Sequence, residues 1–200
     1  MKEFIDKNTG LKWLIFDCKS KQFKSQDWEL FIGLNHKLNN WQSPNIEEFI
    51  CGSYPLGDSL RIAVSNNSQI FFNNSCYQAF AFDNEQLVGT AILTTDKPKH
   101  VYLEDEISDR LKINYIIVNP NYTNRGIGTR MLKSINDNQK LFCNSVKTKG
   151  TVAWVYPTNT ASQKTFLKNK FTRFKKMDSP HRIVFYTSNK KTRKNGGMEP

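Results

Sequence analysis

Long apolar runs and the marks of export are missing from this 200-residue sequence. No window approaches the roughly 18 consecutive apolar residues that a membrane-spanning helix needs. Residues 1–6 contain no apolar segment of the kind that a secretory signal peptide carries. We therefore expect a cytoplasmic protein without a membrane span. Its 38% of hydrophobic residues is enough for a folded core.

Cysteine is also scarce. The four residues Cys18, Cys51, Cys76 and Cys143 lie far apart and form no C-x-x-C pair. Zinc sites and disulfide frameworks need paired or regularly spaced cysteines. We predict four free thiols in a reducing compartment and no metal site.

Acidic residues are nearly absent from the last 60 positions. Residues 1–140 contain 16 basic and 16 acidic residues, whereas residues 141–200 contain 13 basic residues and only Asp178 and Glu199. The net charge of +11 therefore belongs to the C-terminal part. A basic surface attracts polyanions such as nucleotides and nucleic acids, although it can also serve solubility alone. We predict one domain over residues 1–188 and a disordered basic tail over residues 189–200.

Apolar periodicity and turn residues predict a mixed α/β chain. Expected strands cover residues 12–17, 76–82, 86–94, 113–118, 152–156, 171–177 and 182–187. Expected helices cover residues 25–38, a broken region over 45–64, and residues 126–138 and 158–169. Asp83 and Asn84 form the turn of a hairpin. Residues 96–110 are predicted to be a polar connection.

The stretch that carries chemistry is the turn after the strand at 113–118. It contains Gly126 and Gly128 and opens a helix. Glycines let main-chain N–H groups approach an anion closely, and a helix N-terminus adds partial positive charge. A pyrophosphate suits such a loop, and Arg125 and Arg130 could add contacts. The spacing fits neither a Walker A loop nor a Rossmann fingerprint, and the turn taken alone could be an ordinary strand-to-helix connection.

In combination, Val118, Pro120, Tyr122, Gly126 and Gly128 resemble the GNAT superfamily of acyl-CoA-dependent N-acyltransferases. The family pattern has Arg or Gln where this chain has Thr123, which puts one side-chain contact in doubt but not the main-chain cradle.

A second segment supports the same resemblance. Asn159, Phe166 and Phe171 stand at the offsets of the family's later motif, with Ser162 and Lys170 in place of small residues. The predicted strand order also agrees from residue 12 to about residue 187, so the resemblance spans nearly the whole chain.

The resemblance implies a mixed, mostly antiparallel sheet of about six to seven strands flanked by about four helices. The parallel strands at 113–118 and 152–156 would splay apart, so that free main-chain groups could bind the pantetheine arm of acetyl-CoA. The implied cofactor-binding residues are Ile116, Ile117, Val118, Thr123, Asn124, Arg125, Gly126, Ile127, Gly128, Thr129, Asn159 and Phe166.

The implied reaction is transfer of an acetyl group from acetyl-CoA to a primary amine of a small molecule or protein, by direct attack in a ternary complex. A main-chain N–H near Ile117 or Val118 would polarise the thioester carbonyl. The usual central-strand carboxylate is missing, and Phe166 replaces the usual tyrosine acid. Tyr156, Tyr115, His181, Cys143 or ordered water are left as candidates for proton transfer.

Two alternatives stay open. The basic C-terminal part would suit an enzyme that acylates the amine of a charged tRNA, although Arg and stacking aromatics are few there. The missing acid and base would suit a non-catalytic acyl-CoA-binding module. We expect a monomer or a homodimer and an amine acceptor as the partner.

Overall fold

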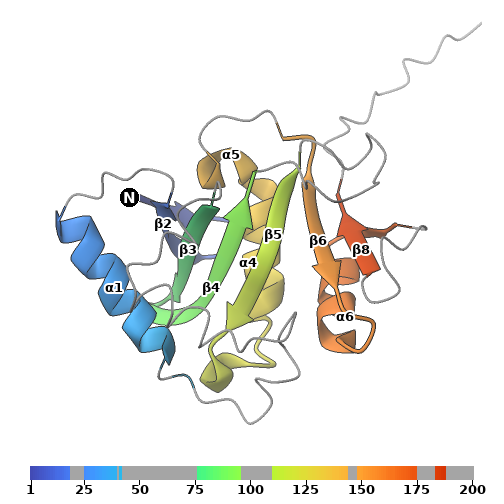
Figure 1. Ribbon diagram of the computed structural model, residues 1–200. Helices are drawn as coiled ribbons and strands as arrows, with labels where there is room; N and C mark the ends of the chain where they lie inside the picture. Colours follow the sequence, from blue (N-terminus) through green and yellow to red (C-terminus); the bar gives the residue numbers. More distant parts are fainter. Residues whose placement is uncertain are drawn as a thin grey trace, which may run out of the picture.

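The computed structural model describes residues 1–18, 25–39, 41, 76–95, 110–143, 148–174 and 183–187. They form one eight-stranded sheet with the order β1-β2-β3-β4-β5-β6-β8-β7 (Figure 1). The strands are β1 (Lys2–Asp6), β2 (Leu11–Asp17), β3 (Cys76–Asp83), β4 (Gln86–Thr94), β5 (Leu111–Val118), β6 (Thr151–Val155), β7 (Thr172–Arg173) and β8 (Ile183–Tyr186). Among these neighbours only β5 and β6 run parallel.

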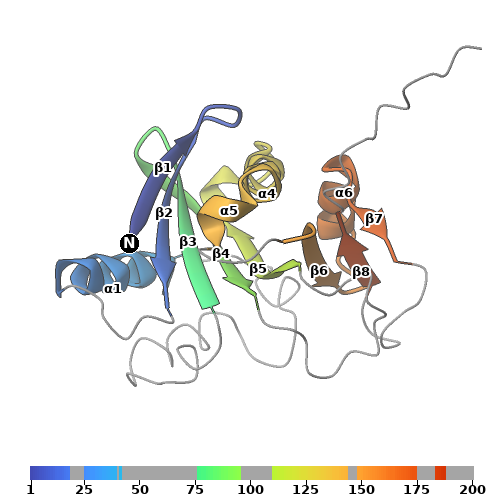
Figure 2. The same cartoon turned by 90° about the horizontal axis from the view of Figure 1, so that it is seen from above.

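Helices cover both faces of this sheet. They are α1 (Ser25–Asn39), α4 (Ile127–Asp137), the short α5 (Gln139–Phe142), α6 (Thr160–Lys168) and the 3-10 turn η2 (Pro120–Tyr122). Figure 2 shows α1 and α4 on opposite sides of the sheet. No helix of the described ranges is long and apolar enough to cross a membrane.

The alternation of side chains along β2 explains the two cores. Leu11, Trp13 and Ile15 join the large core that also contains α4, α5 and α6. Leu14 and Phe16 point the other way and pack with apolar side chains of α1. A strand with both faces buried must be apolar at almost every position. The burial pattern of β2 agrees with this.

Most predicted elements are confirmed, including the mixed and mostly antiparallel sheet. One strand was not predicted from the sequence. The first strand is β1 rather than β2, so the sheet has eight strands instead of six or seven. Of the strand expected at 171–177, the described part contains β7 at Thr172–Arg173, and Phe174 donates its N–H to the Val184 carbonyl. Residues 175–177 lie outside the described residues.

Several predictions fall on parts of the chain that lie outside the described residues. These are the helical region at 45–64, most of the connection at 96–110, His181 and the tail at 189–200. The division into one domain and a tail therefore stays a prediction.

Candidate functional site

The parallel strands β5 and β6 separate along their length. They pair at Leu111 with Thr151, Lys112 with Val152 and Ile113 with Ala153, where the ladder between them ends. β5 continues to Val118, and Figure 1 shows the two strands diverging toward their C-terminal ends. Because β6 no longer covers this edge, the main chain at Ile116–Val118 is available to an extended ligand. This is the splay that the family resemblance implies.

A bulge in β5 begins where the splay begins. Ile92 of β4 lies opposite Tyr115 and Leu93 lies opposite Ile113, so Asn114 is the extra residue. Its side chain donates to Thr94 Oγ1 at 3.2 Å. One extra residue reverses the alternation of the strand. Tyr115 therefore packs on the α1 side, whereas Ile113, Ile116 and Val118 pack on the α4 side.

The connection after β5 is tied to β4. Asn119 donates its main-chain N–H to the Val88 carbonyl at 2.9 Å and its side-chain amide to the Leu87 carbonyl at 3.2 Å. Its side-chain oxygen accepts from the N–H of Asn121 and so caps the start of η2. Thr123 then closes the turn by donating its hydroxyl to the Pro120 carbonyl. The hydrogen bonds of Asn119 to β4 therefore fix where the loop that leads into α4 begins.

Main-chain N–H groups gather at the start of α4. Asn124 and Gly126 both have left-handed torsions, with φ of 61° and 74°. The first hydrogen bond of the helix runs from Arg130 N to Gly126 O. In the described part of the chain, the N–H groups of Ile127, Gly128 and Thr129 meet no acceptor, and no side chain caps the helix. Such a cluster at a helix N-terminus is suited to an anion.

The two glycines leave open space beside these N–H groups. A Cβ on Gly126 would have no neighbour within 4 Å, and one on Gly128 would meet only Val118 Cγ2 at 3.5 Å, an ordinary contact. Gly126 is required by its positive φ. Gly128 is not required by the packing of the protein, so its missing side chain is better explained by close approach of a ligand. The loop therefore fits a pyrophosphate.

The two arginines of this region differ in what they contact. The Arg125 guanidinium is exposed and lies 5.4 Å from the centre of the Tyr122 ring. Arg130 instead bonds Thr9 O at 2.8 Å and both carboxylate oxygens of Asp83 at 2.6 and 3.2 Å. The prediction that Arg130 adds charge to the anion site is therefore not supported, because its guanidinium is engaged by protein acceptors.

On the other side of the splay, α6 begins directly after β6. Asn159 caps this helix by accepting from the N–H of Ser162 at 2.9 Å, so its oxygen already has a partner. Phe166 is 4% exposed and packs between Phe171 and Phe185. Both residues thus have structural contacts, and their predicted contact with the cofactor stays a prediction.

The candidates for proton transfer are separated by the fold. Tyr115 and Tyr156 both follow the last β5–β6 pair along their strands and so lie at the splay, each half-buried. Cys143 is buried and follows α5, past the C-terminal end of α4, with its thiol on the Gln139 carbonyl. A helix of 11 residues is about 16 Å long. Cys143 is therefore too far from the loop at 123–129 to act there.

Comparison with known proteins gives the family. Residues 38–171 match the model of the acetyltransferase (GNAT) family, about two thirds of the chain. The chain belongs to this family. The resemblance seen in the sequence is thus confirmed, and GNAT membership supports acetyl-CoA as the cosubstrate. No curated protein matches the sequence significantly.

Solved structures agree with the GNAT fold. AAC(6')-Ib in complex with ribostamycin and coenzyme A has a TM-score of 0.64 at 14% identity, covering 92% of this chain and 98% of that one. AAC(6')-Ib with paromomycin and acetyl-CoA has a TM-score of 0.63 at 15% identity, with the same coverage. An acetyltransferase from Thermus thermophilus has a TM-score of 0.55 at 15% identity, covering 88% and 96% of the two chains. At these identities the likeness shows the fold alone.

Proposed function

We propose that this GNAT protein transfers an acetyl group from acetyl-CoA to a primary amine of a small molecule or protein, within one ternary complex. The observation that carries the proposal is the cluster of N–H groups of Ile127, Gly128 and Thr129 beside the uncovered edge of β5. The loop at 123–129 would hold the pyrophosphate, and the main chain of Ile116–Val118 would hold the pantetheine arm.

Acetyl-CoA supplies an activated acyl group as its thioester. The protein's part is to fix that group at the splay, where an N–H of Ile117 or Val118 can stabilise charge on the carbonyl oxygen. The amine must be uncharged when it attacks. The phenol groups of Tyr115 and Tyr156 are the described side chains proposed to move a proton there, and His181 is a further candidate.

A substitution series at Gly128 tests the proposal directly. Gly128→Ala adds a Cβ that meets only Val118 Cγ2 at an ordinary contact distance, whereas Gly128→Leu adds a large side chain within the N–H cluster itself. We expect the affinity for acetyl-CoA, measured by isothermal titration, to fall in the order wild type, Gly128→Ala, Gly128→Leu, by about tenfold or more for the last. The unfolding midpoint without ligand reports whether each variant folds.

Failure of the wild-type protein to bind acetyl-CoA would overturn the cofactor assignment. Equal affinity of the wild type and the Gly128→Leu variant would overturn the position of the pyrophosphate. Thiol release with a panel of amines then distinguishes an enzyme from a module that only binds acyl-CoA, since a binding module releases no thiol with any amine.

A further inference from the structure

Helix α4 contacts the β1–β2 hairpin through side chains that lie outside the loop at residues 123–129, which we call the anion loop. Arg130 and Ser134 lie one turn apart on α4 and both contact the β1–β2 hairpin. Arg130 is the fourth residue of the helix, directly after the N–H cluster. A contact that fixes Arg130 therefore fixes the first turn of α4.

Arg130 connects three separate elements. Its Nε donates to the Thr9 carbonyl in the β1–β2 turn, and its two terminal nitrogens donate to the carboxylate of Asp83 at the end of β3. A two-point contact between guanidinium and carboxylate fixes direction as well as distance. The side chains of Arg130 and Asp83 are only 32% and 26% exposed, so water screens the pair less than it screens a surface ion pair.

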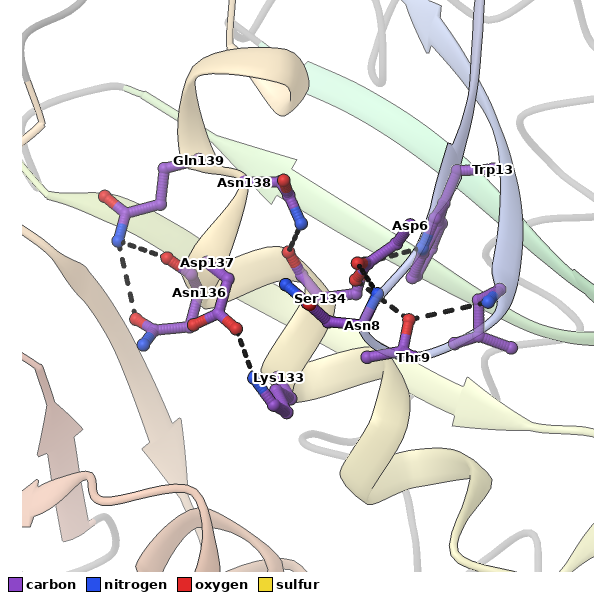
Figure 3. Close-up of polar contacts among 11 residues, drawn as sticks. Asp6, Asn8, Thr9, Trp13, Lys133, Ser134, Asn136, Asp137, Asn138 and Gln139 are labelled. Carbon is purple, nitrogen blue, oxygen red and sulfur yellow. Dashed lines mark hydrogen bonds and ion pairs between the residues drawn. The ribbon is translucent and has the colours of Figure 1, made fainter.

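Ser134 provides the second contact, and it is fully buried. Trp13 of β2 donates its indole N–H to Ser134 Oγ at 2.9 Å. The Ser134 hydroxyl also hydrogen-bonds to Asp6, which accepts from the Asn8 main chain and the Thr9 hydroxyl as well (Figure 3). The hairpin turn that presents the Thr9 carbonyl to Arg130 is itself held in shape by this network.

These contacts lie behind the candidate site rather than in it. Asp83 neutralises Arg130, so the pair adds little net charge to the anion loop. Thr9 also lies outside residues 38–171, which match the family model. We propose that Arg130, braced by Asp83 and the Thr9 carbonyl, is a positioning residue that aims the N–H groups of Ile127–Thr129 at the cofactor's pyrophosphate. This proposal rests on the proposed function.

The test compares two ligands and a charge-neutral double variant. Arg130→Gln with Asp83→Asn removes the brace and leaves the net charge unchanged. Acetyl-CoA contains the pyrophosphate, whereas S-acetylpantetheine contains only the arm and the acetyl group. We expect the dissociation constant of the double variant to rise about tenfold for acetyl-CoA and less than about twofold for S-acetylpantetheine. General loosening of the fold would instead weaken both ligands alike.

Two further variants complete the design. Arg130→Lys keeps the charge but lacks the planar fork, so we expect an intermediate loss for acetyl-CoA. Asp137→Asn breaks the exposed Lys133–Asp137 pair of the same helix and should leave both affinities unchanged. If the double variant fails to fold, Arg130→Lys carries the comparison.

The outcomes separate this proposal from the proposed function. Wild-type protein that does not bind acetyl-CoA would overturn both. Wild-type protein that binds, with a double variant that binds acetyl-CoA equally well or loses both ligands alike, would overturn the brace alone.

Discussion

Asp6 shows how one carboxylate is stabilised by its surroundings at the residue scale. Burial by itself would raise the pKa of Asp6. Hydrogen bonds from the Ser134 and Thr9 hydroxyls and from the main chain of Asn8 and Thr9 outweigh it, so the pKa lies below the ordinary value of 3.8. A group whose pKa is lowered by folding stabilises the protein above its unfolded pKa.

We expect this stabilisation to be present at neutral pH and to be lost as the pH falls below about 4, through the folded pKa of Asp6. Asp6→Asn should lower the free energy of unfolding at neutral pH by about 1–3 kcal/mol and by less in acid. Urea unfolding at several pH values measures both effects. The interpretation fails if wild type and variant lose stability with the same pH dependence.

At the scale of elements, the contact between β4 and α4 depends on the absence of a side chain at Gly89. A Cβ on Gly89 would lie 2.8 Å from the Ile117 carbonyl oxygen and closer still to Met131 Sδ. Met131 is fully buried in the core on this side of the sheet. Gly89 therefore allows α4 to lie close against the sheet.

Gly89→Ala should lower the free energy of unfolding by about 1–3 kcal/mol, because the added methyl group has no space. Gly33→Ala is the matched control. Gly33 is exposed in α1, and a Cβ there meets nothing within 4 Å. Its replacement should raise stability by about 0.5–1 kcal/mol. Chemical denaturation of both variants checks this, and an equal loss from the two would contradict it.

Elements with strong local signals could be predicted from the sequence. The β3–β4 hairpin is an example, since polar residues follow an alternating strand. Its turn was predicted one residue too early, because Asp83 still belongs to β3 and the positive φ values are those of Asn84 and Glu85. β1 was missed because its pattern is weak, with Ile5 65% exposed. The anion-binding loop was predicted from Gly126, Gly128 and the helix that follows them, whereas the splay was implied by the family resemblance.

The contacts of Arg130 could not be predicted in this way. Asp83 is 47 residues from Arg130 in the sequence and Thr9 is 121 residues away. Neither partner belongs to a motif, and an arginine near a glycine loop is more simply interpreted as an anion contact. Only the assembled sheet brings the β1–β2 turn and the β3–β4 turn to the same helix. The position of the β-bulge at Asn114 likewise could not be predicted from the sequence.

At the scale of the whole molecule, the excess of positive charge lies in residues 141–200, whereas the loop at 123–129 precedes them in the sequence. Removal of residues 189–200 takes away Lys190, Lys191, Arg193 and Lys194. We expect the truncated chain to bind acetyl-CoA within about twofold of the full chain, because the contacts proposed for the pyrophosphate are main-chain N–H groups of the loop at 123–129. It should elute from heparin at lower salt. A tenfold loss of acetyl-CoA affinity would instead place the tail in the site.

The shape of the anion loop, residues 123–129, depends on backbone torsion angles more than on particular side chains. Left-handed torsions at Asn124 and Gly126 and the start of a helix are sufficient to present the N–H groups. We therefore expect most residues between 123 and 129 to tolerate substitution during evolution while the backbone of the loop keeps its conformation. At such a site the backbone conformation is better preserved than the amino-acid sequence. Distant homologues are therefore easier to recognise by comparison of structures than by sequence identity.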